Sequence, residues 1–176
     1  MNQSTVAVVR CNDYTPETVY EALKRGVNML GGVERFTRRG ERILLKPNIL
    51  AGDAPEKAVT THPSVLAGCA RLLREAGAHV TFGDSPGMES VRSAVRKSGL
   101  QEAGERCEAQ VGDFSNGSPM TSPQGKLVKT FPIAQAVHDC DGMVNLPKMK
   151  THGLTRITGA IKNLFGCVPG QRKALY

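Results

Sequence analysis

The stretch TTHPSVLAGCARLLREAGAHVTFGDSPG, residues 60–87, decides the fold. Its first part predicts a helix that begins at Pro63 and ends at Gly77, because proline favours the first helical turn and glycine the residue after a helix. The next residues, AHVTFGD (78–84), predict a strand, since β-branched and aromatic residues dominate them. A helix that leads directly into a strand is typical of α/β proteins.

The same alternation extends toward the N-terminus and for one more helix toward the C-terminus. TVAVVR (5–10) and RILLKPN (42–48) predict strands, and a helix between them begins at Pro16 and ends at Gly31. GMESVRSAVRKSG (87–99) predicts the next helix. We therefore expect one α/β domain over residues 1–176, with a mostly parallel sheet and helices on both faces.

The pattern is less regular after residue 100. AQVGDF (109–114) predicts a strand, SNGSP (115–119) a polar loop, and KLVKTFPIA (126–134) an added strand that runs antiparallel. A short helix then leads to GMVNLP (142–147), whose apolar run predicts a buried strand. The last predicted helix has an apolar stripe at helical spacing: Ile157, Ala160, Ile161, Leu164 and Phe165.

No sequence signal marks the end of a domain at the C-terminus. We therefore expect the N-terminal part of a longer domain, which would expose an apolar patch where later elements pack. A homodimer is one way to cover such a patch.

Composition and charge narrow the class of protein. The 176 residues are 40% hydrophobic and 22% charged, which is typical of a globular protein. The sequence shows no signal peptide and no apolar run of ~18 residues, so we expect a cytoplasmic protein without a membrane span. The net charge is +7, and residues 142–176 contain only basic charges. That segment favours an anionic ligand, and its alternative is a solvated basic surface.

The five cysteines are widely spaced and none belongs to a CxxC pair. They therefore predict neither a disulfide framework nor an iron–sulfur or zinc site within this segment. Cys167, in a basic neighbourhood, is the one cysteine that we consider for reactivity, although a structural role is favoured.

Polar residues follow three of the predicted strands. Lys46 and Asn48 follow the strand at 42–48, and Asp84 and Ser85 lie in GDSPG (83–87) after the next strand. NLPKMKTHG (145–153) follows the last strand. Since ligands of open α/β sheets bind beyond the carboxyl ends of the strands, we expect one ligand site there.

GDSPG has two interpretations. Its glycines and the following helix N-terminus suit an anion or metal pocket, in which Asp84 binds a metal or a proton. The alternative is a plain turn in which Asp84 or Ser85 caps the helix. Neither GxxxxGK[ST] nor GxGxxG occurs, so no motif supports nucleotide binding.

The C-terminal segment contains the predicted catalytic pair, His152 and Lys162. An imidazole can act as an acid–base group, and a lysine among like charges has a lowered pKa. On the last predicted helix, Thr155 and Thr158 share a face with Lys162. The predicted ligand-binding residues are Lys46, Asn48, Asp84, Ser85, Lys148, Lys150, Thr151 and Asn163. The sequence identifies no metal. The alternative is that His152 caps a loop and the lysines are solvated.

Three stretches resemble the domain-of-unknown-function family 362: LLKPNIL (44–50), residues 60–87, and NLPKMKTHGLTRITGAIKNLFGCVPGQRKALY (145–176). The resemblance implies an α/β domain that continues beyond Tyr176. It also implies a C-terminal ferredoxin-like module that binds a 4Fe-4S cluster, which this sequence lacks. Electron transfer with such a module or a partner protein is therefore an expectation from the resemblance.

A more distant resemblance is to the lactate racemase family, in which a catalytic histidine precedes a cofactor-binding lysine by ten residues. His152 and Lys162 have this separation. We favour a protein that binds a small anionic ligand or cofactor. The alternatives are a non-catalytic module that docks a partner and a racemase- or isomerase-like enzyme. Nucleic acid binding is not favoured, because few aromatic residues accompany the basic segment.

Overall fold

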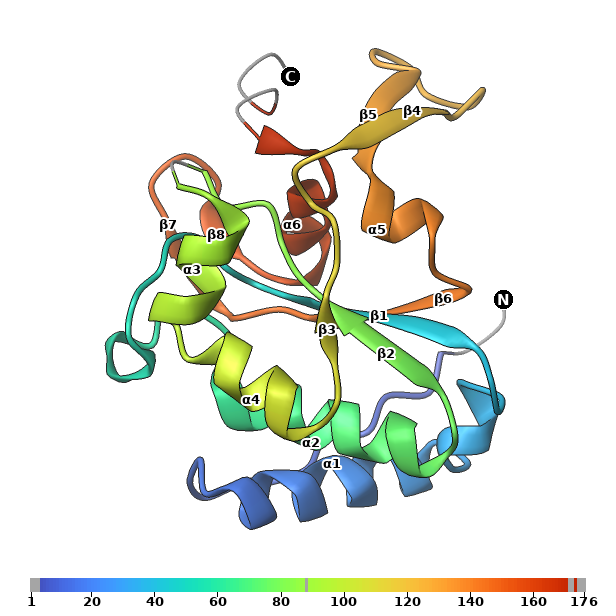
Figure 1. Cartoon of the computed structure of the whole chain (residues 1–176), viewed down its shortest axis with the longest axis vertical. Helices are drawn as coiled ribbons and strands as arrows, with labels where there is room; N and C mark the ends of the chain where they lie inside the picture. The colour runs from blue at the N-terminus through green and yellow to red at the C-terminus, as the bar shows by residue number, and fades with distance from the viewer. Residues whose placement is uncertain (1–3, 88, 171–172, 174–176) are drawn as a thin grey trace.

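A four-stranded parallel sheet forms the centre of the molecule (Figure 1). The computed structural model describes residues 4–87, 89–170 and 173. The strand order is β3-β2-β1-β6. The strands are β1 (Arg42–Pro47), β2 (His79–Phe82), β3 (Gln110–Val111) and β6 (Gly142–Leu146). All three neighbouring pairs are parallel, which confirms the predicted sheet.

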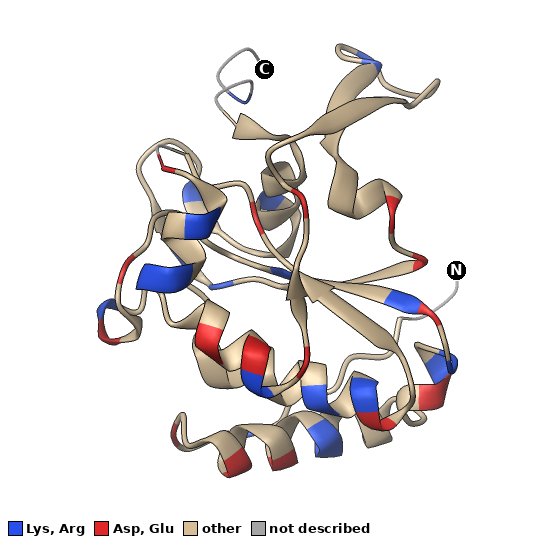
Figure 2. Ribbon diagram, viewed as in Figure 1, with Lys and Arg blue, Asp and Glu red and all other residues tan. Residues whose placement is uncertain are grey.

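Helices cover both faces of this sheet, as predicted. Figure 1 shows α1, α2 and α4 below the sheet and α5 and α6 above it. The helices are α1 (Pro16–Met29), α2 (Pro63–Glu75), α3 (Val91–Lys97), α4 (Leu100–Arg106), α5 (Gln135–His138) and α6 (Ala160–Leu164). Short 3-10 helices occupy Val33–Arg35, Pro55–Lys57 and Phe165–Cys167. Figure 2 shows acidic and basic residues interspersed along α1, α2 and α4.

The two faces of the sheet have different cores. Ile43 and Leu45 of β1 belong to the larger apolar cluster, which also includes Leu66 and Leu73 of α2. Leu44, between them in sequence, packs with the smaller cluster on the other face. Because side chains alternate along a strand, Lys46 lies on the same face as Leu44. A lysine thus enters the interior on the side that α6 covers.

The predicted helix boundaries follow local sequence signals. Pro16 and Pro63 are the first residues of α1 and α2, and the ring of His62 accepts the N–H of Ser64 as an N-cap. Gly77, at φ +86°, follows α2. Helix α4 was not predicted. Gly99, at φ +73°, was predicted to close the helix at 87–99, and it is also the N-cap of α4.

The predicted strand at 5–10 is wrong. This segment is extended, but it belongs to none of the described sheets. Val9 packs against Gly26 of α1, whereas Val6 and Val8 are 78% and 87% exposed. The alternation of side chains at 5–10 therefore arises from an extended segment that packs one side against α1. Such a pattern reveals which side is buried and does not reveal a hydrogen-bonded neighbour.

Two antiparallel hairpins lie outside the main sheet. The first pairs β4 (Gly117–Thr121) with β5 (Thr130–Ala134), which confirms the added strand at 126–134 and corrects the loop at 115–119. The second pairs β7 (Lys150–His152) with β8 (Arg156–Thr158). Both hairpins are largely exposed, so their sequences lack the pattern of a half-buried strand.

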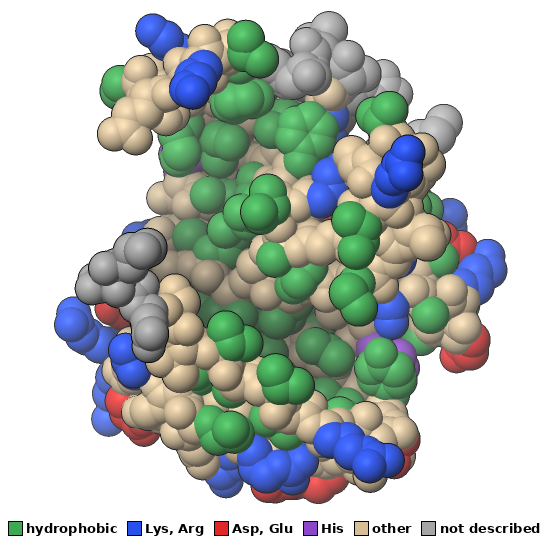
Figure 3. Space-filling model, turned by 180° about the vertical axis from the view of Figure 1, so that it is seen from behind, with side chains coloured by type: hydrophobic (Ala, Val, Ile, Leu, Met, Phe, Trp, Pro, Cys, Tyr) green, Lys and Arg blue, Asp and Glu red, His purple; other side chains and the backbone are tan. Residues whose placement is uncertain are grey.

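The last helix is shorter than predicted and exposes its apolar stripe. It begins at Ala160 because the preceding residues form β8. Ile161 is 89% exposed and Ile157 60%, while Asn163 is buried. Figure 3 shows a broad band of apolar side chains on the rear face of the molecule.

Among the described residues, every helix is too short or too polar to cross a bilayer. Met88, Arg172 and Tyr176, which the sequence interpretation included, lie outside the described residues.

Candidate functional site

A cavity of about 600 Å³ lies beyond the carboxyl ends of β1 and β2. Asn48 follows β1, and Asp84 and Ser85 follow β2. The β7–β8 hairpin and α6 contribute the other residues of the wall, among them Lys150 and Lys162. Three segments that are far apart in the sequence therefore meet at one place. We call this space the strand-end cavity.

Eight of the ten predicted site residues line the strand-end cavity. They are Asn48, Asp84, Ser85, Lys150, Thr151, His152, Lys162 and Asn163. The structure separates the other two from it: Lys46 is buried behind the wall, and Lys148 lies near Tyr14. The sequence interpretation therefore grouped most of these residues correctly in space.

A buried ion pair forms the base of the cavity. Lys46 Nζ lies 2.6 Å from Asp84 Oδ1, and the two side chains are 0% and 4% exposed. Asp84 also accepts the N–H groups of Ile49 (2.6 Å) and Ser85 (2.8 Å). Both carboxylate oxygens are thus occupied, which favours the structural interpretation of Asp84 over metal binding. Lys46 holds Asp84 and has no surface on the cavity.

Asn163 and Gly166 attach the α6 segment to this ion pair. Asn163 Nδ2 donates to Lys46 O (3.1 Å) and to Asn145 Oδ1 (2.7 Å). A Cβ at position 166 would lie 2.0 Å from Asp84 Oδ1. The backbone can approach the carboxylate this closely only because residue 166 is glycine. Asn163 therefore acts first as a crosslink between α6 and the ends of β1 and β6.

Four of the described lysines line the cavity, and three of them give it a positive wall, because the fourth, Lys57, is paired with Asp53. Lys150 donates to Val59 O (2.6 Å), Lys173 donates to Ser85 O, and Lys162 lies 5.6 Å from the Phe165 ring centroid. Burial lowers the pKa of Lys150 and of Lys173; the charge of Asp84 opposes this shift in both, and the charge of Lys162 adds to it by a smaller amount. Within the described part of the chain, none of the three has a carboxylate partner at ion-pair distance. The arrangement suits an anion, which would supply the missing negative charge.

His152 has a structural role in the hairpin that faces the cavity. Its Nδ1 accepts the N–H groups of Leu154 (3.1 Å) and Thr155 (3.2 Å). The ring thus caps the β7–β8 turn, as the alternative interpretation of the sequence held. In the neutral ring the proton then resides on Nε2, which is the nitrogen left for a ligand. Thr155 lies in the turn and Thr158 on β8, so the predicted helix face with Lys162 is wrong.

Lys148 points away from the lysines of the cavity. Its Nζ lies 3.3 Å from the Tyr14 hydroxyl, and Tyr14 stacks on His62 at 4.1 Å. Lys148 and Lys150 are two residues apart and would share a side in a continuous strand. Residues 147–149 do not form a strand, so this alternation is lost.

The cysteines do not assemble into a cluster site. Cys69 and Cys167 are buried, Cys11 is exposed, and all five are free. Among the residues that the structure describes, no three His, Cys, Asp or Glu side chains are placed to hold a metal. Burial raises the pKa of the Cys167 thiol, which opposes reactivity. These residues do not fit a 4Fe-4S cluster.

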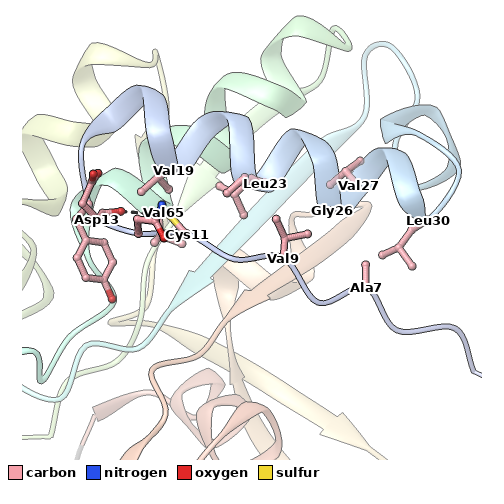
Figure 4. A pocket seen from close by; sticks show the side chains of 13 residues that line it. Ala7, Val9, Cys11, Asp13, Val19, Leu23, Gly26, Val27, Leu30 and Val65 are labelled. Carbon is pink, nitrogen blue, oxygen red and sulfur yellow. Dashed lines mark hydrogen bonds between the residues drawn. The ribbon is translucent and has the colours of Figure 1, made fainter.

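A second cavity, of about 470 Å³, is apolar and lies between the N-terminal segment and α1. Figure 4 shows Val9, Leu23, Val27 and Leu30 around it, with Asp13 at one end. Its wall lacks the lysines of the strand-end cavity.

Among the polar residues that line the strand-end cavity, sequence reasoning did not assign Lys57, Thr158 and Lys173 to the site. Lys173 was counted in the basic segment but not assigned to the site. Thr158 was noted and was expected on a helix. For Lys173 the signal was present, because it belongs to the basic segment at 142–176, which favours an anionic ligand.

Comparison with known proteins gives one family and one relative. The family described as "Domain of unknown function (DUF362)" matches residues 43–176. A thylakoid-associated protein of Synechocystis sp. is 34% identical over 170 residues, which cover 97% of this chain and 52% of the relative. The chain thus spans about half the length of that relative. No solved structure gives a significant match. The likeness to lactate racemases is not shown by these comparisons.

Proposed function

This chain belongs to the DUF362 family, and from that premise we propose that it binds a small anionic ligand or cofactor in the strand-end cavity. The observation that carries the proposal is the wall of Lys150, Lys162 and Lys173, which line one cavity without carboxylate partners among the described residues. The one carboxylate there, Asp84, is neutralised by Lys46. A cavity of about 600 Å³ is large enough for a small organic anion.

The test is calorimetric titration with sulfate and with inorganic phosphate. Lys162→Ala should weaken binding by about 1–3 kcal/mol, the scale of a charge-assisted hydrogen bond. Lys148→Ala is the matched control, since it removes the same charge outside the cavity. Equal losses in both variants would indicate non-specific attraction, and unchanged binding in Lys162→Ala would place the anion elsewhere. Either result contradicts the proposal.

A second candidate is proton-transfer catalysis by His152, as in a racemase or isomerase. It rests on His152, which lines the cavity. Its Nδ1 accepts two backbone N–H groups, so the ring could act as a proton donor through Nε2–H, and another group would have to act as the base. His152→Asn keeps a side-chain acceptor for the turn and removes the imidazole. Solvent deuterium incorporation into a bound hydroxy acid, followed by NMR, should stop in this variant. Incorporation in neither protein removes the candidate.

A third candidate is a module that docks a ferredoxin-like domain, with which the family resemblance associates a 4Fe-4S cluster. Because the cysteines of this chain form no cluster site, the cluster would belong to the partner. Anion binding without binding of a ferredoxin-like partner would favour the first proposal over this third candidate.

A cytoplasmic location stays a prediction, and the relative's name associates that relative with thylakoids.

A further inference from the structure

Two residues that line the strand-end cavity each carry a buried polar atom that has no hydrogen-bond partner among the described residues. The two atoms are Thr158 Oγ1 and Asn48 Oδ1. Thr158 is only 3% exposed, so its hydroxyl is desolvated without compensation. We propose that the ligand is an anion that also carries a hydroxyl group, and that Thr158 and Asn48 bind this hydroxyl. The inference rests on the proposed anion-binding function and specifies its ligand class.

Thr158 lies next to the positive wall. In the β7–β8 hairpin it is the direct partner of Lys150, and directly opposed residues have Cβ atoms about 4.5–5.5 Å apart. Both residues line the cavity. The two side chains therefore leave the hairpin on the same face.

Asn48 is held in place by its backbone. Its N–H donates to Thr61 Oγ1 (2.8 Å), and its carbonyl accepts the N–H of Thr61 (3.1 Å). Thr61 Oγ1 in turn donates to Leu146 O at the end of β6 (2.6 Å). These bonds fix the backbone of Asn48 beside the cavity, and its side-chain oxygen has no hydrogen-bond partner among the described residues.

A hydroxyl is a neutral group that fits both side chains. The threonine hydroxyl can donate or accept, and an amide presents one acceptor and two donors. A ligand hydroxyl can donate to one of them and accept from the other. A methyl group would leave both atoms unpaired, and a second cation would be repelled by the lysines.

The experiment compares ligands that differ in hydroxyl groups. Calorimetry measures glycerol phosphate against propyl phosphate, and glycerate against propionate. In the unmodified protein, the hydroxyl form of at least one pair should bind about tenfold more tightly, which corresponds to about 1.4 kcal/mol. Thr158→Val should abolish this preference and leave the affinity for the form without hydroxyls unchanged, whereas Thr158→Ser should retain the preference.

Thr60→Val is the control. Thr60 is 1% exposed and its hydroxyl is also unpartnered, but it does not line the cavity. This variant should retain the preference for the hydroxyl form.

The outcomes separate this inference from the proposed function. Tight binding of both members of each pair without preference overturns the hydroxyl inference and leaves anion binding intact. Binding of neither member overturns both. A preference that persists in Thr158→Val, or that disappears in Thr60→Val, also overturns the inference. The comparison in the unmodified protein stays decisive if Thr158→Val does not fold. The pair that shows the preference identifies the anionic group as phosphate or carboxylate.

Discussion

Lys46 and Asp84 form a buried ion pair between the ends of two neighbouring strands, with 2.6 Å between Nζ and Oδ1. Lys46 lies near the end of β1, and Asp84 follows β2 by two residues. The backbone N–H groups of Ile49 and Ser85 complete the shell of the carboxylate. The pair therefore fixes both loops that form the base of the strand-end cavity. Its charges cancel, so the lysines above it determine the charge of the site.

Asp84→Asn should destabilise the fold strongly. The substitution leaves the ammonium of Lys46 buried without its counterion, which costs about 3–5 kcal/mol in comparable cases. Urea unfolding measures this loss. Asp141→Asn is the control, because it breaks an exposed ion pair with Arg42 and should change stability little. Similar effects of the two variants would contradict the structural role of the buried pair.

Gly166→Ala should destabilise the protein by about 1–3 kcal/mol through overpacking. The added Cβ would lie 2.0 Å from Asp84 Oδ1 and 2.7 Å from Lys46 Nζ, so the pair or the 3-10 turn must move. Thermal unfolding provides the measurement. Gly159→Ala is the matched control, because its Cβ would meet nothing within 4 Å and its φ of −146° suits alanine. Unchanged stability in Gly166→Ala would show that this close approach is not required.

His62 should make stability depend on pH near neutrality. Burial lowers its pKa below 6.5, and the nearby charge of Lys148 lowers it further. The unfolded chain then binds the proton more readily, so the free energy of unfolding falls as pH decreases below about 6.5. His62→Asn keeps an N-cap acceptor but does not titrate. The difference in unfolding free energy between the two proteins should therefore change between pH 7.5 and 5. A constant difference across this range would refute the assignment.

Anion affinity should fall as the solution is made alkaline, and it should fall at a lower pH than it would if exposed lysines bound the anion. Burial lowers the pKa of Lys150 and Lys173 below the ordinary 10.5, and an anion needs their charged forms. Affinity is complete below these lowered values and is lost as pH rises through them. Sulfate suits the titration, since its own charge stays constant over this range. Sulfate affinity that is unchanged up to pH 10.5 would contradict this cause.

Local sequence signals account for most of the sheet and its helices. Pro16, Pro63 and Gly77 mark helix ends because their backbone preferences act within one turn. The apolar runs at 42–48 and 142–147 predict β1 and β6 because burial follows strand periodicity. The same reasoning grouped the cavity residues, since the carboxyl ends of parallel strands meet at one edge of a sheet.

The tertiary structure alone decided which of these residues face the cavity and which hold it together. Lys46 and Lys150 were both predicted to bind the ligand. In the structure, Lys46 forms an ion pair with Asp84, and Lys150 lines the strand-end cavity. The segment at 5–10 has the alternating pattern of a strand, but it packs against helix α1. A sequence pattern records which side of a segment is buried. The partner of a side chain or of a backbone N–H comes from residues far away in the chain, and only the folded arrangement specifies it.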